Sequence, residues 1–139
     1  MFLRFFLFFS SLPGAKSALE IVLQHWYSPG VNHSGIDEIS FSLARCVVER
    51  LRGRPELLEI ARRNLSGWQR RNADSPSLLR CYAEWEVILT RPLEEICALL
   101  VAETEEGQRL RQNSPFAGVL SPAEVWEIKE QHRHAAASA

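Results

Sequence analysis

Apolar residues recur every three or four positions in several separate segments, and this spacing constrains the fold of the 139-residue chain more than any other feature. In an α-helix such spacing places the apolar side chains on one face, so each segment predicts an amphipathic helix. Between the segments the chain carries proline or glycine, which favours tight turns over long linkers. We therefore expect an all-α protein, an irregular bundle of about five or six short helices.

The punctuation between segments gives expected bounds for each helix. Gly53 ends the first segment, and a proline at or near the first helical position opens several of the later ones. The segment after Pro92 is apolar over most of its surface, so we expect it to be central in the bundle. The expected helices span residues 36–51, 55–71, 76–89, 92–101, 104–112 and 122–131, and the prolines are Pro55, Pro76, Pro92 and Pro122.

The same pattern divides the chain into three parts. A single helical domain is expected at 36–131, because 139 residues with 46% hydrophobic and 24% charged side chains suit one globular domain. Residues 132–139 are expected to form a frayed tail. Residues 1–35 are expected to be a leader outside the fold, because the phenylalanine-rich run after Met1 does not continue the helical pattern.

Two explanations of the leader stay open. The charged start at Met1 to Arg4 and the apolar run after it resemble a secretory signal, with a cleavage site at Ala15-Lys16-Ser17. Alternatively, the reading frame extends upstream of a true start near Val31, since Met1 is the only methionine. An over-extended frame predicts a cytoplasmic protein, whereas a signal peptide predicts an exported one. No membrane contact is expected unless the leader is genuine, because its apolar run is too short to span a bilayer.

The most sharply punctuated stretch lies between residues 110 and 128. Ser121 and Glu124 fit a capping box, with Pro122 at the first position of the last helix. The segment before it predicts an ordered turn in which a glycine adopts a positive φ. We expect either a structural joint packed on the body or a recognition loop that presents Phe116 to a partner. The residues of this candidate partner loop are Ser114, Pro115, Phe116 and Gly118.

The same stretch carries a family resemblance. The run LRQNSPFAGVLSPAEVWEI, with ARRNLSGWQRR and EWEVILTRPLEEICALL upstream, resembles a small, largely uncharacterised bacterial family whose members share a C-terminal RQ-S-PFAGVL-P-E-W run. The resemblance extends from Ile36 to Ile128. Because that family is associated with genes beside nucleotidyltransferase-like toxins, it implies a cytoplasmic accessory or antitoxin-like role. It implies no activity and no catalytic residues.

Charge is distributed unevenly along the chain although the net charge is −1. Arginines outnumber acidic residues from Arg45 to Arg80, and glutamates outnumber basic residues from Cys81 to Glu130. Either the two parts complement each other within the fold, or the basic part binds nucleic acid or an acidic partner. The candidate basic face on the second helix comprises Arg62, Arg63, Arg70 and Arg71.

Reaction signatures are missing from the sequence, which has no nucleophile elbow, P-loop or glycine-rich dinucleotide loop. Cys46, Cys81 and Cys97 match no zinc or redox spacing, so we expect them reduced and mostly buried. His132 and His134 in the tail form only a weak metal pattern. We therefore expect no catalytic residue, no cofactor and no metal, and an enzyme is the least favoured class.

These observations favour a non-enzymatic, protein-binding accessory protein. With the resemblance included, the expected partner is a nucleotide-handling toxin encoded nearby, whose basic substrate channel the acidic C-terminal half would cover. The alternative is a nucleic-acid-binding regulator that uses the candidate basic face. Such a regulator would bind DNA or RNA with an affinity that falls steeply as salt rises.

Overall fold

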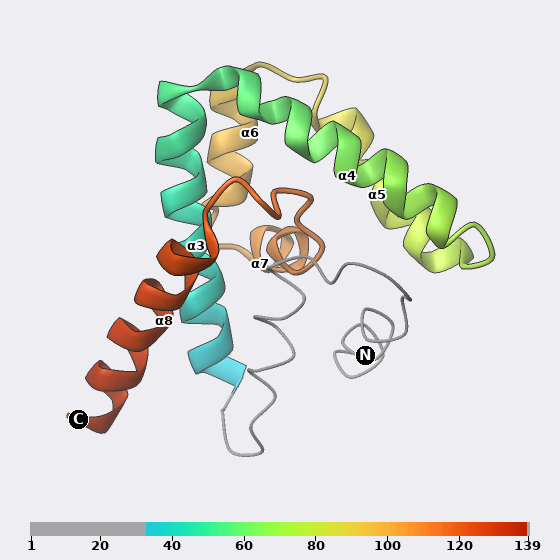
Figure 1. Ribbon diagram of the computed structural model, residues 1–139. Coiled ribbons are helices and arrows are strands. Elements are labelled where there is room, and N and C mark those ends of the chain that lie inside the picture. Colours follow the sequence, from blue (N-terminus) through green and yellow to red (C-terminus); the bar gives the residue numbers. More distant parts are fainter. Residues whose placement is uncertain (1–32, 139) are drawn as a thin grey trace.

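The computed structural model describes residues 33–138, and within that range it consists of six α-helices and no β-strand (Figure 1). The expected all-α class is confirmed. The helices are α3 (His33–Gly53), α4 (Leu58–Arg71), α5 (Pro76–Ile88), α6 (Leu93–Leu100), α7 (Glu105–Gln112) and α8 (Pro122–Ala137), and a short 3-10 helix, η1 (Pro55–Leu57), precedes α4.

The long helix α3 is the element against which most of the others pack. Helices α6, α7 and α8 all contact it. Helix α8 runs antiparallel to α3, because Glu124 near its start pairs with Arg50 and His132 near its end contacts Ser42. Helices α4 and α5 pack on each other as a second antiparallel pair that leads away from the C-terminal end of α3 (Figure 1).

The hydrophobic core is one cluster of buried side chains to which all six helices and the 114–120 segment contribute. Trp85 of α5 is 0% exposed, and Phe116 meets its ring edge-on with the centroids 5.8 Å apart. Ile96 and Leu100 of α6 are also buried. The expectation that the 92–101 segment is central to the bundle is therefore correct only in part, because one face of α6 is buried while the helix packs mainly against α3 and α7.

Three expected boundaries differ from the structure. The segment expected to be helical from residue 55 begins as the 3-10 helix Pro55–Leu57, so α4 starts only at Leu58. Helix α3 begins at His33, three residues before the expected start at Ile36. Helix α8 continues to Ala137, so most of the expected frayed tail at 132–139 is helical. Its last turns are alanine-rich, and Ser42 of α3 lies 2.8 Å from the His132 ring nitrogen, which ties them to the body. The expected leader lies outside the described residues, apart from its last three, which belong to α3.

The expectation for the cysteines is only partly correct. Cys97 is buried, Cys46 and Cys81 are half-buried, and all three are free thiols. Burial raises the pKa of both the Cys97 and the Cys46 thiol. Both thiols therefore stay protonated at neutral pH, where only the thiolate is a good nucleophile.

The capping box at the start of α8 is confirmed. Ser121 Oγ accepts a hydrogen bond of 3.2 Å from the Glu124 amide, and the Ser121 amide donates one of 2.7 Å to the Glu124 carboxylate. The same carboxylate also accepts from the Arg50 guanidinium of α3. One side chain thus closes the cap of α8 and fastens that helix to α3.

Replacing Ser121 by alanine is expected to lower the free energy of unfolding by about 1 kcal/mol, because the Glu124 amide at the helix start loses the Ser121 hydroxyl that accepts its hydrogen bond. Urea denaturation followed by circular dichroism measures the change. The control is Ser77→Ala, at an exposed serine early in α5, for which the change should stay within about 0.5 kcal/mol. Equal effects at the two positions would argue against a stabilising cap.

Candidate interaction surfaces

The candidate partner loop is a structural joint in this fold. Pro115 and Phe116 are buried, with Phe116 only 4% exposed, so the hypothesis that Phe116 is presented to a partner is wrong. Ser114 is half-buried, and Gly118 is exposed at a φ of +93°, as expected for a glycine turn. The loop contributes to the core rather than to the surface.

A hydrogen-bonding residue that the sequence patterns did not single out holds this loop in place. Asn64 of α4 donates from Nδ2 to the carbonyl oxygens of Pro115, at 2.8 Å, and Ala117, at 2.9 Å. An asparagine inside a helix is a poor helix former, and this was the only local signal for its role. Its contacts lie 51 and 53 residues away along the chain, beyond any local spacing rule.

The candidate basic face is on the surface, and most of it lacks acidic partners. Arg62 pairs with Glu59 at 3.5 Å, and Arg70 donates to Ser66 Oγ at 3.0 Å. Within residues 33–138, no carboxylate forms an ion pair with Arg63, Arg70 or Arg71.

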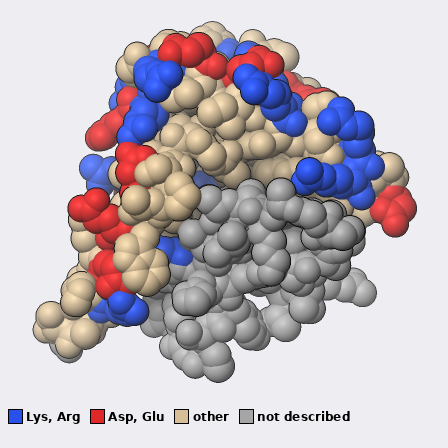
Figure 2. All heavy atoms as spheres, viewed as in Figure 1, with Lys and Arg blue, Asp and Glu red and all other residues tan. Residues whose placement is uncertain are grey.

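The geometry of α4 places these arginines unevenly. Arg63 and Arg70 are seven residues apart, hence about 20° apart around the helix and about 10 Å apart along it. Arg71 is displaced by about 100° from Arg70, so it lies at the edge of the face. Figure 2 shows basic side chains gathered over the outer part of the α4–α5 pair.

Elsewhere the basic and acidic parts of the chain pair with each other. Arg50 of α3 pairs with Glu124 of α8, and Arg52 pairs with Glu94 of α6 at 3.0 Å. The expectation that the two parts complement each other within the fold is therefore confirmed for α3. It does not hold for the arginines of α4, which the fold turns toward solvent.

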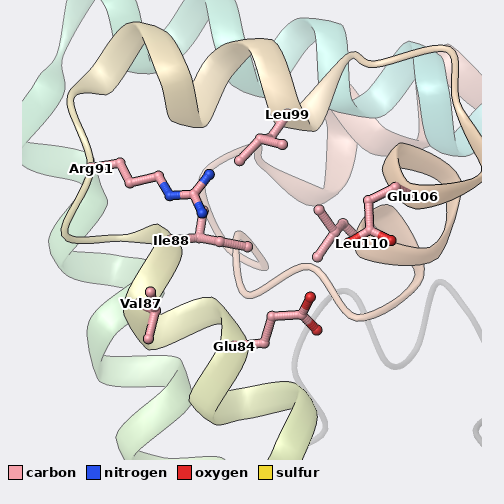
Figure 3. A pocket seen from close by; sticks show the side chains of 7 residues that line it. All are labelled: Glu84, Val87, Ile88, Arg91, Leu99, Glu106 and Leu110. Atoms are coloured by element: carbon pink, nitrogen blue, oxygen red, sulfur yellow. The ribbon is translucent and has the colours of Figure 1, made fainter.

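A second surface, the α5–α7 hollow, was not anticipated from the sequence. It has a volume of about 260 Å³, and Ile88, Leu99 and Leu110 form its apolar part. Val87 at its rim is 60% exposed, the most exposed large aliphatic side chain among the described residues. Figure 3 shows the hollow, whose lining residues are Glu84, Val87, Ile88, Arg91, Leu99, Glu106 and Leu110.

The rim of the α5–α7 hollow has two electrostatic sides. On one side Arg109 forms a fork with both oxygens of Glu84, at 2.9 and 2.6 Å, and also pairs with Glu106. The hydrogen bonds from Arg109 lower the pKa of Glu84, so its charge persists under mildly acidic conditions. On the other side Arg91 forms no ion pair with any carboxylate in the described part of the chain.

Sequence spacing contained a weak indication of this surface. Val87 lies outside the apolar stripe of α5, next to Glu86, where a solvent-facing polar residue is the usual choice. Only the fold reveals that Leu99 and Leu110, from two other helices, converge beside it.

Arg111 is a buried cation that bonds to backbone carbonyl groups. Its guanidinium donates to the carbonyl oxygens of Leu100, at 3.2 Å, and Ala102, at 2.8 Å, at the end of α6. It also lies 5.2 Å from the centre of the Phe41 ring and 3.8 Å from the Asp37 carboxylate. These contacts satisfy carbonyls that a helix end leaves without partners, so Arg111 has a structural role.

Lys129 of α8 is, like Arg111, a buried cation, and the residue is 3% exposed. Burial lowers the pKa of its ammonium group from 10.5 to about 7. In the unfolded chain the group keeps its ordinary pKa, so above neutral pH the unfolded state binds more protons than the folded one. Stability therefore rises with pH between about 7 and 10, and it levels off at its lowest value below about 7, where the group is protonated in both states.

The corresponding variant is Lys129→Met, which removes the titrating group and keeps most of the side-chain volume. For the unmodified chain, the free energy of unfolding should rise by about 1–2 kcal/mol between pH 6.5 and pH 8.5. At pH 6.5 the variant should be more stable than the unmodified chain, and its free energy of unfolding should hardly change between pH 6.5 and pH 8.5. Urea midpoints at the two pH values measure this, and an equal pH slope in both proteins would refute the assignment to Lys129.

No group of three or more histidine, cysteine or acidic side chains between residues 33 and 138 is placed to hold a metal ion. His132 contacts Ser42, while His134 lies 3.7 Å from Glu130, so the two histidines have separate partners. In the same part of the chain, no helix combines the length and hydrophobicity needed to cross a membrane. Comparison of the chain with protein-family models, curated proteins and solved structures finds no match.

Proposed function

We propose that this chain is a non-enzymatic accessory protein that binds another protein through the α5–α7 hollow. The observation that carries the proposal is Val87, which is 60% exposed at the rim of a recess with an apolar floor. Completing the burial of a valine contributes about 1 kcal/mol. A hollow of about 260 Å³ accepts one or two side chains, so it would act as the anchor of a larger contact.

The partner we propose is a nucleotide-handling toxin encoded nearby, with this chain in an antitoxin-like role. The family resemblance supports this choice, and so does the presence of acidic side chains on two helices that border the hollow, α5 and α7. Glu84 and Glu106 share a single arginine, which leaves that side of the rim with a net negative charge. A basic channel on the partner would be attracted to such a surface.

Co-expression with the protein encoded next to this chain tests the proposal, with the mass of the purified complex measured by light scattering. Val87→Asp should weaken the complex about tenfold or more, because an acid would then face an apolar contact. Trp126→Asp is the matched control, since Trp126 is also an exposed apolar residue, at 49%, but lies on α8.

Circular dichroism would confirm that both variants remain helical. A complex that survives Val87→Asp unchanged would refute binding at the α5–α7 hollow. Failure of the unmodified chain to bind the neighbouring gene's product would refute the antitoxin-like role.

A second candidate function is nucleic-acid binding by the candidate basic face of α4. It is favoured by Arg63, Arg70 and Arg71, which face solvent and lack acidic partners in the described part of the chain. Changing all three to glutamine should remove low-salt binding to labelled RNA or DNA and flatten its salt dependence. The same change at Arg45, exposed on α3, is the control. No binding by the unmodified chain at low salt would exclude this function.

A further inference from the structure

The residues that line the α5–α7 hollow indicate which kind of side chain it would bind. Its floor is aliphatic, formed by Ile88, Leu99 and Leu110. Such a floor favours an aliphatic side chain over a polar one, because a polar group would lose its water without gaining a partner. The centre of the occupant should therefore be a leucine-like residue.

The two rims of the hollow differ in charge. Figure 3 shows Arg91 reaching from the α5–α6 turn into the recess, with Leu99 beside it, and Glu84 and Glu106 on the other side. Arg91 forms no ion pair among the described residues. Glu84 and Glu106 carry two negative charges against the single positive charge of Arg109. The hollow is thus positive at one rim and negative at the other.

From this arrangement we infer that the occupant is a helical segment of the partner protein with an aliphatic anchor between one acidic and one basic side chain. The acid would pair with Arg91, and the base would lie against Glu84 and Glu106. Residues three or four apart on one helix face lie about 5–6 Å apart, which suits a charge on each side of a central anchor. The inference rests on the proposed protein-binding function and specifies its partner chemistry.

Synthetic helical peptides of about 18 residues test the inference, since peptides much shorter than this are poorly helical. Each carries a central leucine flanked one turn away on either side by glutamate and lysine, by two glutamates, or by two lysines. A fourth peptide has the mixed charges and alanine at the centre. Fluorescence anisotropy with the full chain measures the affinity of each peptide. Because a peptide can bind in either direction, the comparison rests on charge composition rather than order.

The mixed peptide should bind the unmodified chain at least about threefold tighter than either single-charge peptide. The alanine peptide should bind about tenfold more weakly than the leucine peptide. Arg91→Glu should reverse the preference, so that the two-lysine peptide binds tightest. That reversal has no explanation in a merely structural role of Arg91.

Three results would overturn the inference. The first is that the peptides keep the same order of affinity for Arg91→Glu as for the unmodified chain. The second is that no peptide binds more tightly with leucine than with alanine at its centre. The third is that the chain associates with itself and that Val87→Asp abolishes this self-association. The last result would place a second copy of the chain in the hollow. The proposed function fails separately, either because the complex with the neighbouring gene's product tolerates Val87→Asp or because no such complex forms.

Discussion

Replacing Trp85 by alanine should lower the free energy of unfolding by about 3–5 kcal/mol, the loss expected when a fully buried aromatic side chain is deleted. The Trp85 side chain is 0% exposed and packs edge-on against Phe116, so its removal leaves a cavity between α5 and the 114–120 loop. The loop would lose its main anchor, although the bonds from Asn64 to its carbonyls would remain. Urea denaturation monitored at a helical circular-dichroism band measures the loss.

The control for Trp85 is Trp126→Ala, which deletes the same side chain from the surface of α8. Trp126 is 49% exposed and has Arg133 at 5.9 Å from its ring, so the change should cost no more than about 0.5–1 kcal/mol. Where Trp85→Ala proves too unstable to purify, Trp85→Phe gives a smaller loss of the same sign. Similar losses for Trp85→Ala and Trp126→Ala would contradict the assignment of Trp85 to the core.

Two glycine-to-alanine changes should shift the free energy of unfolding in opposite directions. At Gly107 in α7 an added Cβ would lie 2.9 Å from the Cβ of Ala102, 3.0 Å from its carbonyl carbon and closer still to its carbonyl oxygen. That oxygen also accepts a hydrogen bond from buried Arg111 at 2.8 Å, so the backbone cannot easily move away. Gly107→Ala should therefore lower the free energy of unfolding by about 1–3 kcal/mol despite alanine's better helix propensity.

At Gly67 in α4, by contrast, an added Cβ has no neighbour within 4 Å. Gly67→Ala should raise the free energy of unfolding by about 0.5–1 kcal/mol, because alanine restricts the unfolded chain and favours the helix. The same urea titration measures both variants. A stabilising Gly107→Ala would mean that the 101–104 connection does not lie against α7 as described.

Local features of the fold could be read from the sequence wherever the cause is local. The capping box at Ser121 and Glu124 depends on residues three apart, and it occurs as predicted. The turn at Gly118 and the buried stripe of α6 likewise follow from neighbouring residues. These features need only helix geometry and the backbone preferences of individual residues.

Features that depend on distant residues could not be read in this way. Phe116 in a loop suits either a partner or the core, and only the position of Trp85 decides between them. The sequence around Arg111 favours a surface position, and its burial depends on the end of α6, which packs beside it in the fold. The α5–α7 hollow depends on side chains from three helices converging, although Val87 alone marks it on α5. Tertiary packing overrides local patterns at each of these positions.

Hydrogen–deuterium exchange of the chain, alone and with the neighbouring gene's product, tests the central claim most directly, because it locates the contact without altering any residue. If the surface between α5 and α7 binds the partner, amides from residue 84 to residue 110 should exchange more slowly in the complex, while those in the outer part of α4 stay unchanged. Protection confined to α4, or equal exchange with and without the partner, would contradict the account.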